Sequence, residues 1–391
     1  MTAAVQQTQT LTPRPVPADG RPPVDGPQPG DGPGSARDRA LPSDQGPLFS
    51  DTLQCLAEGR DLSRLEAAWA LTQIIEGTAG EAEAAAFLMG LRVKGETADE
   101  IAGLLQTMRR LAVPVDTVHR GALVDIVGTG GDRLGTFNIS TTTSLVVAGA
   151  GVKVAKHGNR AASSRSGSAD VMQALGVRVD LGPTEVAACI EQVGIGFMLA
   201  SAHHPAMGKV GAVRRALGVR TVFNFLGPLT NPAGVRRQLL GVCAPEYLEV
   251  LAGALARVGC ERALVVCGHG GMDELSVSGP SSVIQVEHGV VGRSYVLTPE
   301  ECGLPRSDQS GLTGGDPTEN SLITRSILSG AGGAARDVVL LNAAAALYVA
   351  GEVDRIPDGI DRARASIDSG RAARVLQDLV TFSNELAADR P

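Results

Sequence analysis

The feature that most limits the fold is a change of sequence pattern at Pro114. Before it, residues 48 to about 118 carry apolar side chains three and four positions apart, and Ser63–Glu66 resembles a capping box. After it, short apolar runs alternate with helical stretches; the runs are Val124–Val127, Val152–Ala155, Gly196–Ala200 and Ala263–Cys267. Such alternation predicts βαβ units, with a parallel sheet covered by helices on both faces.

The domain organisation follows from this change. We expect an α/β fold with a small helical N-terminal domain, residues 48–118, joined by helices within about 205–235. Residues 119–391 would form a larger α/β domain around a mostly parallel central sheet, closed by a helix over Asp337–Ala350. Val283–Val286 and Arg293–Leu297 flank His288–Gly289 and predict a hairpin at the sheet edge. Residues 1–47 hold ten of the 22 prolines and are expected to be a disordered tail.

Composition limits the partners of the chain. A net charge of −7 and 3% aromatic residues argue against nucleic-acid binding. The six cysteines are scattered without a C-x-x-C pair, which indicates buried, reduced thiols. No secretory signal is evident, and the apolar stretch Val338–Ala350 is too short to span a bilayer and is interrupted by Asn342. We therefore expect a soluble, cytoplasmic protein that binds neither membranes nor nucleic acid.

A glycine-rich segment is the strongest local signal. Asp125–Asp132 reads as a strand that runs into Gly128, Gly130 and Gly131, whose backbone N–H groups can crowd around an anion. Asn138–Thr141 follows, and then an apolar helical stretch that a Ser or Thr would cap. A phosphate there would meet N–H donors and a helix dipole. The alternative is a plain strand-to-helix turn, and the spacing fits neither the Walker pattern nor the dinucleotide fingerprint.

Two further segments carry cations and hydroxyls after predicted strands. Lys156–Arg160 and Ser163–Asp170 follow one strand, where Lys156 would serve a phosphorylated ligand as a point charge. Taken alone, Ser164 and Ser168 are more often N-caps. Arg214 and its neighbour lie on a predicted short helix and could bind a carboxylate through two N–H bonds, although such arginines are usually just solvated.

Other candidate ligands are paired histidines and paired acids. His203–His204 lacks a third metal ligand at suitable spacing, so a hydrogen-bonding role in a loop is favoured. Asp273–Glu274 follows a glycine turn at a strand end and offers hard oxygens, which suit Mg²⁺ better than zinc. A surface Asp-Glu pair is the alternative.

These motifs together resemble the anthranilate phosphoribosyltransferase family, in order and approximate spacing, over residues 48 to 390. The matching segments are Gly128–Asp132, Asn138–Thr141, Lys156–Arg160, Gly167–Asp170, Val213–Arg215, Asn224–Pro232 and Asp273–Glu274. The resemblance implies the nucleoside phosphorylase/phosphoribosyltransferase type of fold and a homodimer that pairs through the helical domain. It also implies phosphoribosyl transfer from phosphoribosyl pyrophosphate to anthranilate, with Mg²⁺, in tryptophan biosynthesis.

The resemblance also assigns residues by position. Those implied to bind phosphoribosyl pyrophosphate are Gly128, Gly131, Asp132, Thr136, Asn138, Ile139, Ser140, Thr141, Lys156, His157, Gly158, Asn159, Arg160, Ala161, Ala162, Ser163, Ser164 and Ser168. Those implied to contact anthranilate are Gly128, Asn159 and Arg214, and the implied Mg²⁺ ligands are Ser140, Asp273 and Glu274.

The implied reaction needs neutralisation of the leaving pyrophosphate and positioning of the amine. Lys156 is expected to assist the first, Arg214 and Asn159 the second, and His157 is a candidate proton acceptor. Two alternatives remain open: a pyrimidine nucleoside phosphorylase, and a divergent nucleic-acid-binding relative without transferase activity.

Overall fold

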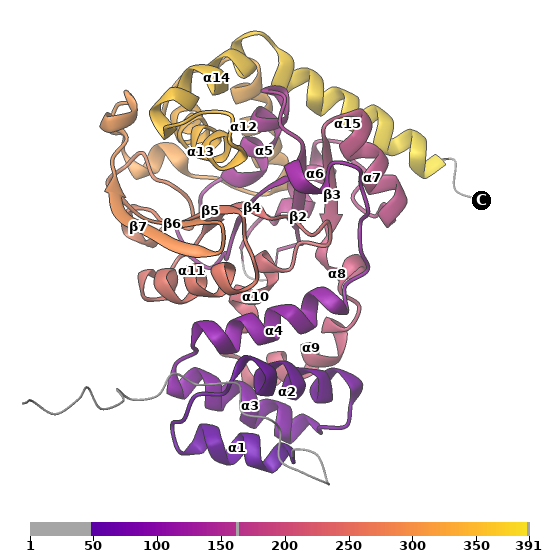
Figure 1. Ribbon diagram of the computed structural model, residues 1–391. Helices are drawn as coiled ribbons and strands as arrows, with labels where there is room; N and C mark the ends of the chain where they lie inside the picture. The colour runs from indigo at the N-terminus through magenta and orange to yellow at the C-terminus, as the bar shows by residue number, and fades with distance from the viewer. Residues whose placement is uncertain (1–47, 162–163, 389–391) are drawn as a thin grey trace, which may run out of the picture. The chain divides into compact units, whose positions relative to one another are not determined.

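The computed structural model describes residues 48–161 and 164–388, so the expected Pro-rich tail, residues 1–47, lies outside the described residues. The described chain begins with four helices (Figure 1): α1 (Phe49–Ala57), α2 (Arg64–Glu76), α3 (Glu81–Lys94) and α4 (Ala98–Arg110). The predicted capping box is confirmed, because Glu66 N donates to Ser63 Oγ at 3.2 Å and Ser63 N donates to Glu66 Oε2 at 2.7 Å. Two later helices, α9 (Met207–Leu217) and α10 (Phe223–Leu229), share the apolar core of this bundle.

A seven-stranded sheet, in the order β3-β2-β1-β4-β5-β6-β7, forms the centre of the larger part. Its strands are β1 (Val124–Gly128), β2 (Val154–Gly158), β3 (Ile195–Leu199), β4 (Arg237–Gly241), β5 (Arg262–Cys267), β6 (Ser281–Glu287) and β7 (Val290–Leu297). The first five are parallel and the last two antiparallel, so the predicted α/β class with a mostly parallel sheet is confirmed.

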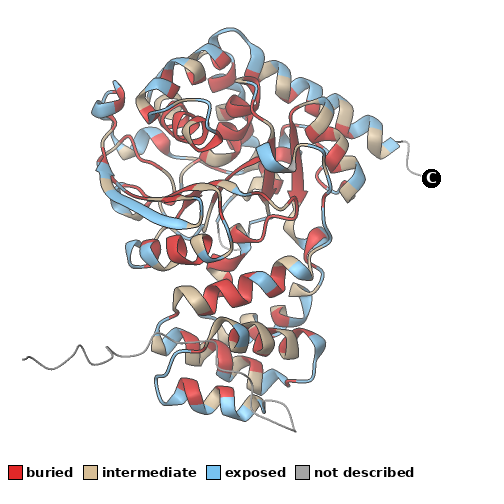
Figure 2. Ribbon diagram, in the orientation of Figure 1, coloured by how far each residue is buried: buried red, intermediate tan, exposed pale blue. Residues whose placement is uncertain are grey.

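The predicted edge hairpin is also confirmed. His288 and Gly289 form its turn with positive φ values of 48° and 75°. Figure 2 shows β7 largely in pale blue, as expected for a strand paired on one side only.

Strand β4 was not predicted, although it lies in the middle of the sheet. Its first two residues, Arg237 and Gln238, are polar, so the sequence lacks the apolar run by which the other strands were predicted. Arg237 Nη2 binds Glu261 at 2.5 Å, and Gln238 Nε2 donates to the Pro228 carbonyl at 2.7 Å. Tertiary partners therefore satisfy the polar groups that a central strand would otherwise leave buried and unpaired.

Helices cover both faces of the sheet (Figure 1). The remaining helices are α5 (Ile139–Gly149), α6 (Ser168–Ala174), α7 (Pro183–Gln192), α8 (Ala200–His203), α11 (Leu248–Arg257), α12 (Pro317–Leu328), α13 (Ala334–Ala350), α14 (Ile356–Asp368) and α15 (Arg371–Ala388). Short 3₁₀ turns are η1 (Arg120–Ala122), η2 (Pro245–Tyr247), η3 (His269–Gly271), η4 (Glu300–Cys302) and η5 (Gln309–Leu312). None of the described helices is long and apolar enough to cross a membrane.

The buried apolar side chains form two clusters, one on each face of the sheet. One lies between the sheet and α5, α7, α13 and α15. The other lies on the opposite face of the sheet and includes Val127 of β1, Val265 of β5 and Leu251 of α11. It continues into the bundle through Phe225 of α10 and Leu104 of α4. The helical bundle and the sheet thus share one continuous core, and α10 also meets the sheet where its Pro228 carbonyl accepts from Gln238 Nε2 of β4.

Candidate active site

A pocket of about 810 Å³ lies at the carboxyl ends of the parallel strands. It is lined mainly by the glycine-rich segment, the start of α5, the segment after β2 and the acidic pair. The lining residues predicted from the sequence are Gly128, Gly131, Asp132, Thr136, Asn138, Ser140, Asn159, Arg160, Ala161, Ser164, Asp273 and Glu274. Ligands of open α/β sheets bind at this edge, because the loops that follow parallel strands converge there.

The glycine-rich loop is held in place by backbone and carboxylate contacts. Thr129 N continues the β1–β4 pairing by donating to the Gly241 carbonyl at 2.9 Å. Gly130 N donates to Asp273 Oδ2 at 2.6 Å. A side chain at Gly128 would overlap the Asp273 carboxylate, so only glycine allows this approach. The loop that the sequence predicts to bind an anion therefore lies directly against the acidic pair.

Helix α5 points its N-terminus at the same pocket, but its cap differs from the prediction. The helix begins at Ile139 with Asn138 as N-cap, so Ser140 and Thr141 lie in its first turn and do not cap it. The Asn138 side chain makes no cap hydrogen bond; it donates to the Ser166 carbonyl at 3.2 Å and accepts from Asn320 Nδ2 at 2.9 Å. This leaves the positive end of the α5 dipole facing the pocket.

The segment after β2 divides between the pocket and the core. Asn159, Arg160 and Ala161 line the pocket, and Asp170 holds them through Ala161 N at 2.8 Å and Arg160 Nη1 at 3.0 Å. Ser168 Oγ accepts from Asn159 N at 3.1 Å. Ala162 and Ser163 lie outside the described residues.

Lys156 does not line this pocket. Its side chain is buried, with Nζ donating to the Ile126 carbonyl at 2.8 Å beneath the glycine-rich loop. Burial lowers the pKa of Lys156, while the charges of Asp125, Glu274 and Asp273 oppose that change. In this structure Lys156 can therefore act on the pocket only through its charge.

His157 is buried as well, and its ring packs edge-on against His204 with 5.3 Å between centroids. Burial, followed by the neighbouring His204, holds the pKa of His157 well below its ordinary value. His203 Nδ1 lies 3.1 Å from the Val113 carbonyl, which agrees with the predicted hydrogen-bonding role for His203, although this residue ends helix α8 and does not lie in a loop.

Three carboxylates converge beside the glycine-rich loop. Asp132, Asp273 and Glu274 each offer an oxygen atom, and these atoms lie within 4.8 Å of one another. Burial and then the nearby Asp132 raise the pKa of Asp273 to about 6. Burial and then Asp273 raise the pKa of Glu274 well above its ordinary value. Asp132 Oδ2 and Glu274 Oε2 are buried without a hydrogen-bond partner among the described residues, which is the arrangement that a divalent cation would satisfy.

Ser140 lines the same pocket as Asp273 and Glu274. Arg214 lies on α9 and does not line the 810 Å³ pocket. Its guanidinium lies 5.6 Å from the centroid of the Phe223 ring, and burial lowers its pKa. The structure thus places Gly128 and Asn159 in the same pocket, but it does not place Arg214 there.

Comparison with known proteins identifies the family. A glycosyl transferase family model for the a/b domain matches residues 120–373, and one for the helical bundle domain matches residues 50–112. A relative from Moorella thermoacetica, named anthranilate phosphoribosyltransferase, is 51% identical over 330 residues, which are 84% of this chain and 97% of the relative. The chain belongs to the anthranilate phosphoribosyltransferase family. An Azorhizobium caulinodans relative of the same name is 50% identical over 87% of this chain and 98% of its own length.

Solved structures of the anthranilate phosphoribosyltransferase family agree with this assignment. The Thermus thermophilus enzyme has a TM-score of 0.81 at 45% identity and covers 85% of this chain and 99% of its own. The Saccharomyces cerevisiae enzyme, solved in complex with PRPP and Mg, has a TM-score of 0.79 at 30% identity, covering 86% and 98%. Membership in this family decides against the pyrimidine nucleoside phosphorylase and the non-catalytic nucleic-acid binder.

Some residues that line the pocket in this family member were not predicted as site residues. One wall of the pocket is formed by Gly314, Gly315 and Asn320. Two hydrogen bonds hold this wall in place: Gly314 N donates to the Gly135 carbonyl at 2.8 Å, and Gly315 N donates to Asn320 Oδ1 at 2.7 Å. The double glycine before a capped helix was a usable signal. Arg220 also lines the pocket, and nothing in its local sequence distinguishes it from a solvated arginine.

Proposed function

We propose that the pocket at the carboxyl ends of the parallel strands carries out the reaction of this family. The phosphoribosyl group of phosphoribosyl pyrophosphate would pass to the amine of anthranilate, giving N-(5-phosphoribosyl)anthranilate and pyrophosphate in tryptophan biosynthesis. Family membership over more than four-fifths of the chain supports this activity.

The observation that carries the proposal is the junction of the glycine-rich loop with Asp132, Asp273 and Glu274 beside the N-terminus of α5. A diphosphate needs donors for its oxygens and a counter-charge for its leaving group. Loop amides and the helix terminus supply the donors, and the carboxylates, with Ser140 nearby, would hold Mg²⁺. Bound there, Mg²⁺ would neutralise the departing pyrophosphate.

Lys156 would add positive charge from beneath the loop. Its Nζ is bound to the Ile126 carbonyl, so we assign it an electrostatic role and not direct contact with the phosphates. Such a charge acts strongly because Lys156 is only 1% exposed, and low-polarity surroundings weaken its screening.

The acceptor would bind beside Gly128 and Asn159 in the pocket, with Arg214 of α9 as the partner of its carboxylate. Arg214 has no ion pair in the described part of the chain, and burial already disfavours its charged form. The carboxylate of anthranilate would supply the counter-charge, and Asn159 would orient the amine. An aromatic amine is a weak base that can attack without prior deprotonation. His157 is buried, does not line the pocket and has a pKa well below its ordinary value, so we do not assign it the proton-accepting role expected from the sequence.

The decisive experiment follows anthranilate fluorescence. We expect the signal to fall only when phosphoribosyl pyrophosphate and Mg²⁺ are both supplied, and to be stable when either is omitted. Turnover of thymidine with inorganic phosphate at a comparable rate would contradict the proposal.

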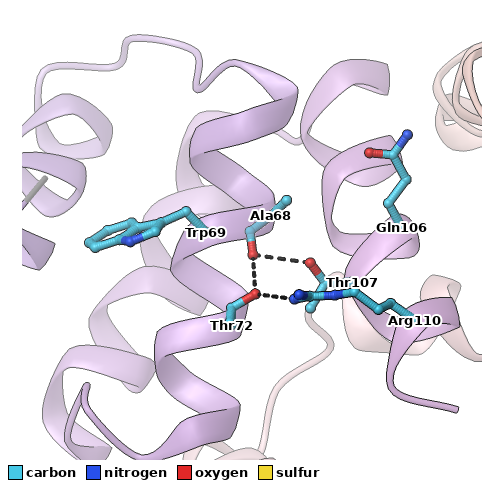
Figure 3. Close-up of a pocket in the computed structure, with 6 residues that line it drawn as sticks. All are labelled: Ala68, Trp69, Thr72, Gln106, Thr107 and Arg110. Carbon is cyan, nitrogen blue, oxygen red and sulfur yellow. Dashed lines mark hydrogen bonds between the residues drawn. The ribbon is translucent and has the colours of Figure 1, made fainter. Parts of the chain in front are cut away.

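We also propose a cytoplasmic homodimer that pairs through the helical bundle. A hollow of about 430 Å³ lies on α2 and α4, lined by Ala68, Trp69, Thr72, Gln106, Thr107 and Arg110 (Figure 3). Leu65, one turn before Trp69, is 53% exposed on α2. Pairing would cover these apolar groups. Light scattering at micromolar concentration should give twice the chain mass, and a monomer would contradict this proposal.

A further inference from the structure

Arg220, in the link between α9 and α10, binds the glycine-rich loop. Its Nη2 donates to the Gly130 carbonyl at 3.1 Å, and its Nη1 donates to the Gly131 carbonyl at 3.2 Å. The guanidinium also lies 5.7 Å from the centroid of the Phe225 ring. One rigid fork thus holds two consecutive carbonyl groups of the loop.

The loop is held from the opposite side as well. Gly130 N donates to Asp273 Oδ2, so the two ends of this residue are fixed by a carboxylate and by a guanidinium. Gly131 has a φ of 82°, and a Cβ placed there would lie 2.5 Å from Arg220 Nη1. The positive φ favours glycine at this position, and any other residue there would displace the Arg220 guanidinium.

The direction of the loop amides follows from these contacts. In a trans peptide the C=O of one residue and the N–H of the next point in opposite directions. With the carbonyls of Gly130 and Gly131 turned toward Arg220, the N–H groups of Gly131 and Asp132 point away from it. Neither N–H has an acceptor in the part of the chain that the structure describes. They are the donors that a phosphate would use.

We propose that Arg220 is a positioning residue for the phosphoribosyl donor, which acts by holding the carbonyls of Gly130 and Gly131 so that the following amides face the pyrophosphate. This inference rests on the function proposed above. Arg220 acts through the loop, so donor binding should depend on the planar guanidinium group, whose two N–H donors reach both carbonyls, and not only on its positive charge.

The helical bundle supports this arrangement. Phe225 beneath Arg220 stacks on Tyr247 with 4.1 Å between ring centroids. The Tyr247 hydroxyl donates to Glu96 Oε2 at 3.1 Å, in the link between α3 and α4. The orientation of Arg220 is therefore fixed by the bundle and by α10. Through its hydrogen bonds, Arg220 in turn orients the carbonyl groups of the glycine-rich loop.

The test compares Arg220→Met and Arg220→Lys with Arg236→Met as a matched control. Arg236 is exposed and also donates to a backbone carbonyl, that of Gly259 at 3.1 Å, but unlike Arg220 it does not line the pocket. KM for each substrate and calorimetric binding of phosphoribosyl pyrophosphate with Mg²⁺ would be measured on full-length, folded variants.

We expect both Arg220 variants to raise the donor KM and its dissociation constant about tenfold, the effect of losing one strong charged hydrogen bond. The KM for anthranilate should stay unchanged, as should all constants of the Arg236 variant. The lysine variant should resemble the methionine variant, because an ammonium group cannot span both carbonyls.

Recovery of normal donor binding by Arg220→Lys would overturn the inference, since charge alone would then suffice. An equal rise in both KM values would also overturn it. An inactive wild-type enzyme would instead contradict the proposed function, and the calorimetric comparison would still decide the role of Arg220 in donor binding.

Discussion

Replacing Asp273 with asparagine should stabilise the metal-free protein while it abolishes the response to Mg²⁺. Asp273 is 8% exposed and lies beside Asp132 and Glu274. Its pKa is raised from 3.8 to about 6 by burial and then by Asp132. Asparagine keeps an oxygen for the Gly130 N–H and places its amide donors toward the remaining carboxylates.

The magnitude follows from the pKa. A raised pKa means that the folded protein holds its proton more tightly than the unfolded chain does. Stability is therefore lost as pH rises from 3.8 to about 6, and the loss persists above that range. At about 1.4 kcal/mol per pKa unit, the ionised Asp273 costs the metal-free fold at most about 3 kcal/mol. The neutral amide avoids this cost.

Thermal unfolding in a chelator and in Mg²⁺ is the assay. At pH 7.5 in chelator, Asp273→Asn should melt several degrees above the wild type, and the difference should shrink toward pH 4. Mg²⁺ should raise the Tm of the wild type by mass action and leave the variant unchanged. Asp361→Asn, at an exposed carboxylate on α14, serves as control. A variant that melts at or below the wild type in chelator, or that Mg²⁺ stabilises equally, would refute the reasoning.

Two further substitutions test neighbouring parts of the site. Asn342 Oδ1 accepts from Leu275 N at 3.0 Å and its Nδ2 donates to the Leu275 carbonyl at 2.9 Å, immediately after the acidic pair. Asn342→Leu should raise the Mg²⁺ concentration that gives half-maximal activity. The control Ser366→Ala, which removes a buried hydrogen bond to the Val146 carbonyl, should lower Tm without changing that Mg²⁺ concentration. If both variants needed more Mg²⁺, the role of Asn342 in positioning the acidic pair would be contradicted. Arg214→Met should raise the KM for anthranilate about tenfold or more, with little change for phosphoribosyl pyrophosphate. The exposed Arg215→Met is its control, and equal KM changes in both arginine variants would count against the assignment.

Features that depend on neighbours in the chain were predicted well. The capping box at Ser63 is confirmed because both partners lie within one helical turn. The strand that ends at Gly128 was predicted to run into a glycine-rich turn because apolar β-branched residues stop where three glycines begin. The same reasoning missed β4, whose polar start is stabilised by Glu261 and by other distant partners.

What the sequence by itself determined is therefore the class of fold, the family and the segments that surround the pocket, since each depends on local pattern or on ordered motifs. Only the tertiary structure decided which side chains face the pocket. Asp132 joins Asp273 across 141 positions, whereas Lys156 turns into the core toward the Ile126 carbonyl. Arg220 becomes part of the site because the bundle holds α10 against the sheet. The direction of a side chain depends on packing between elements that are distant in the sequence, so a local sequence pattern cannot predict it.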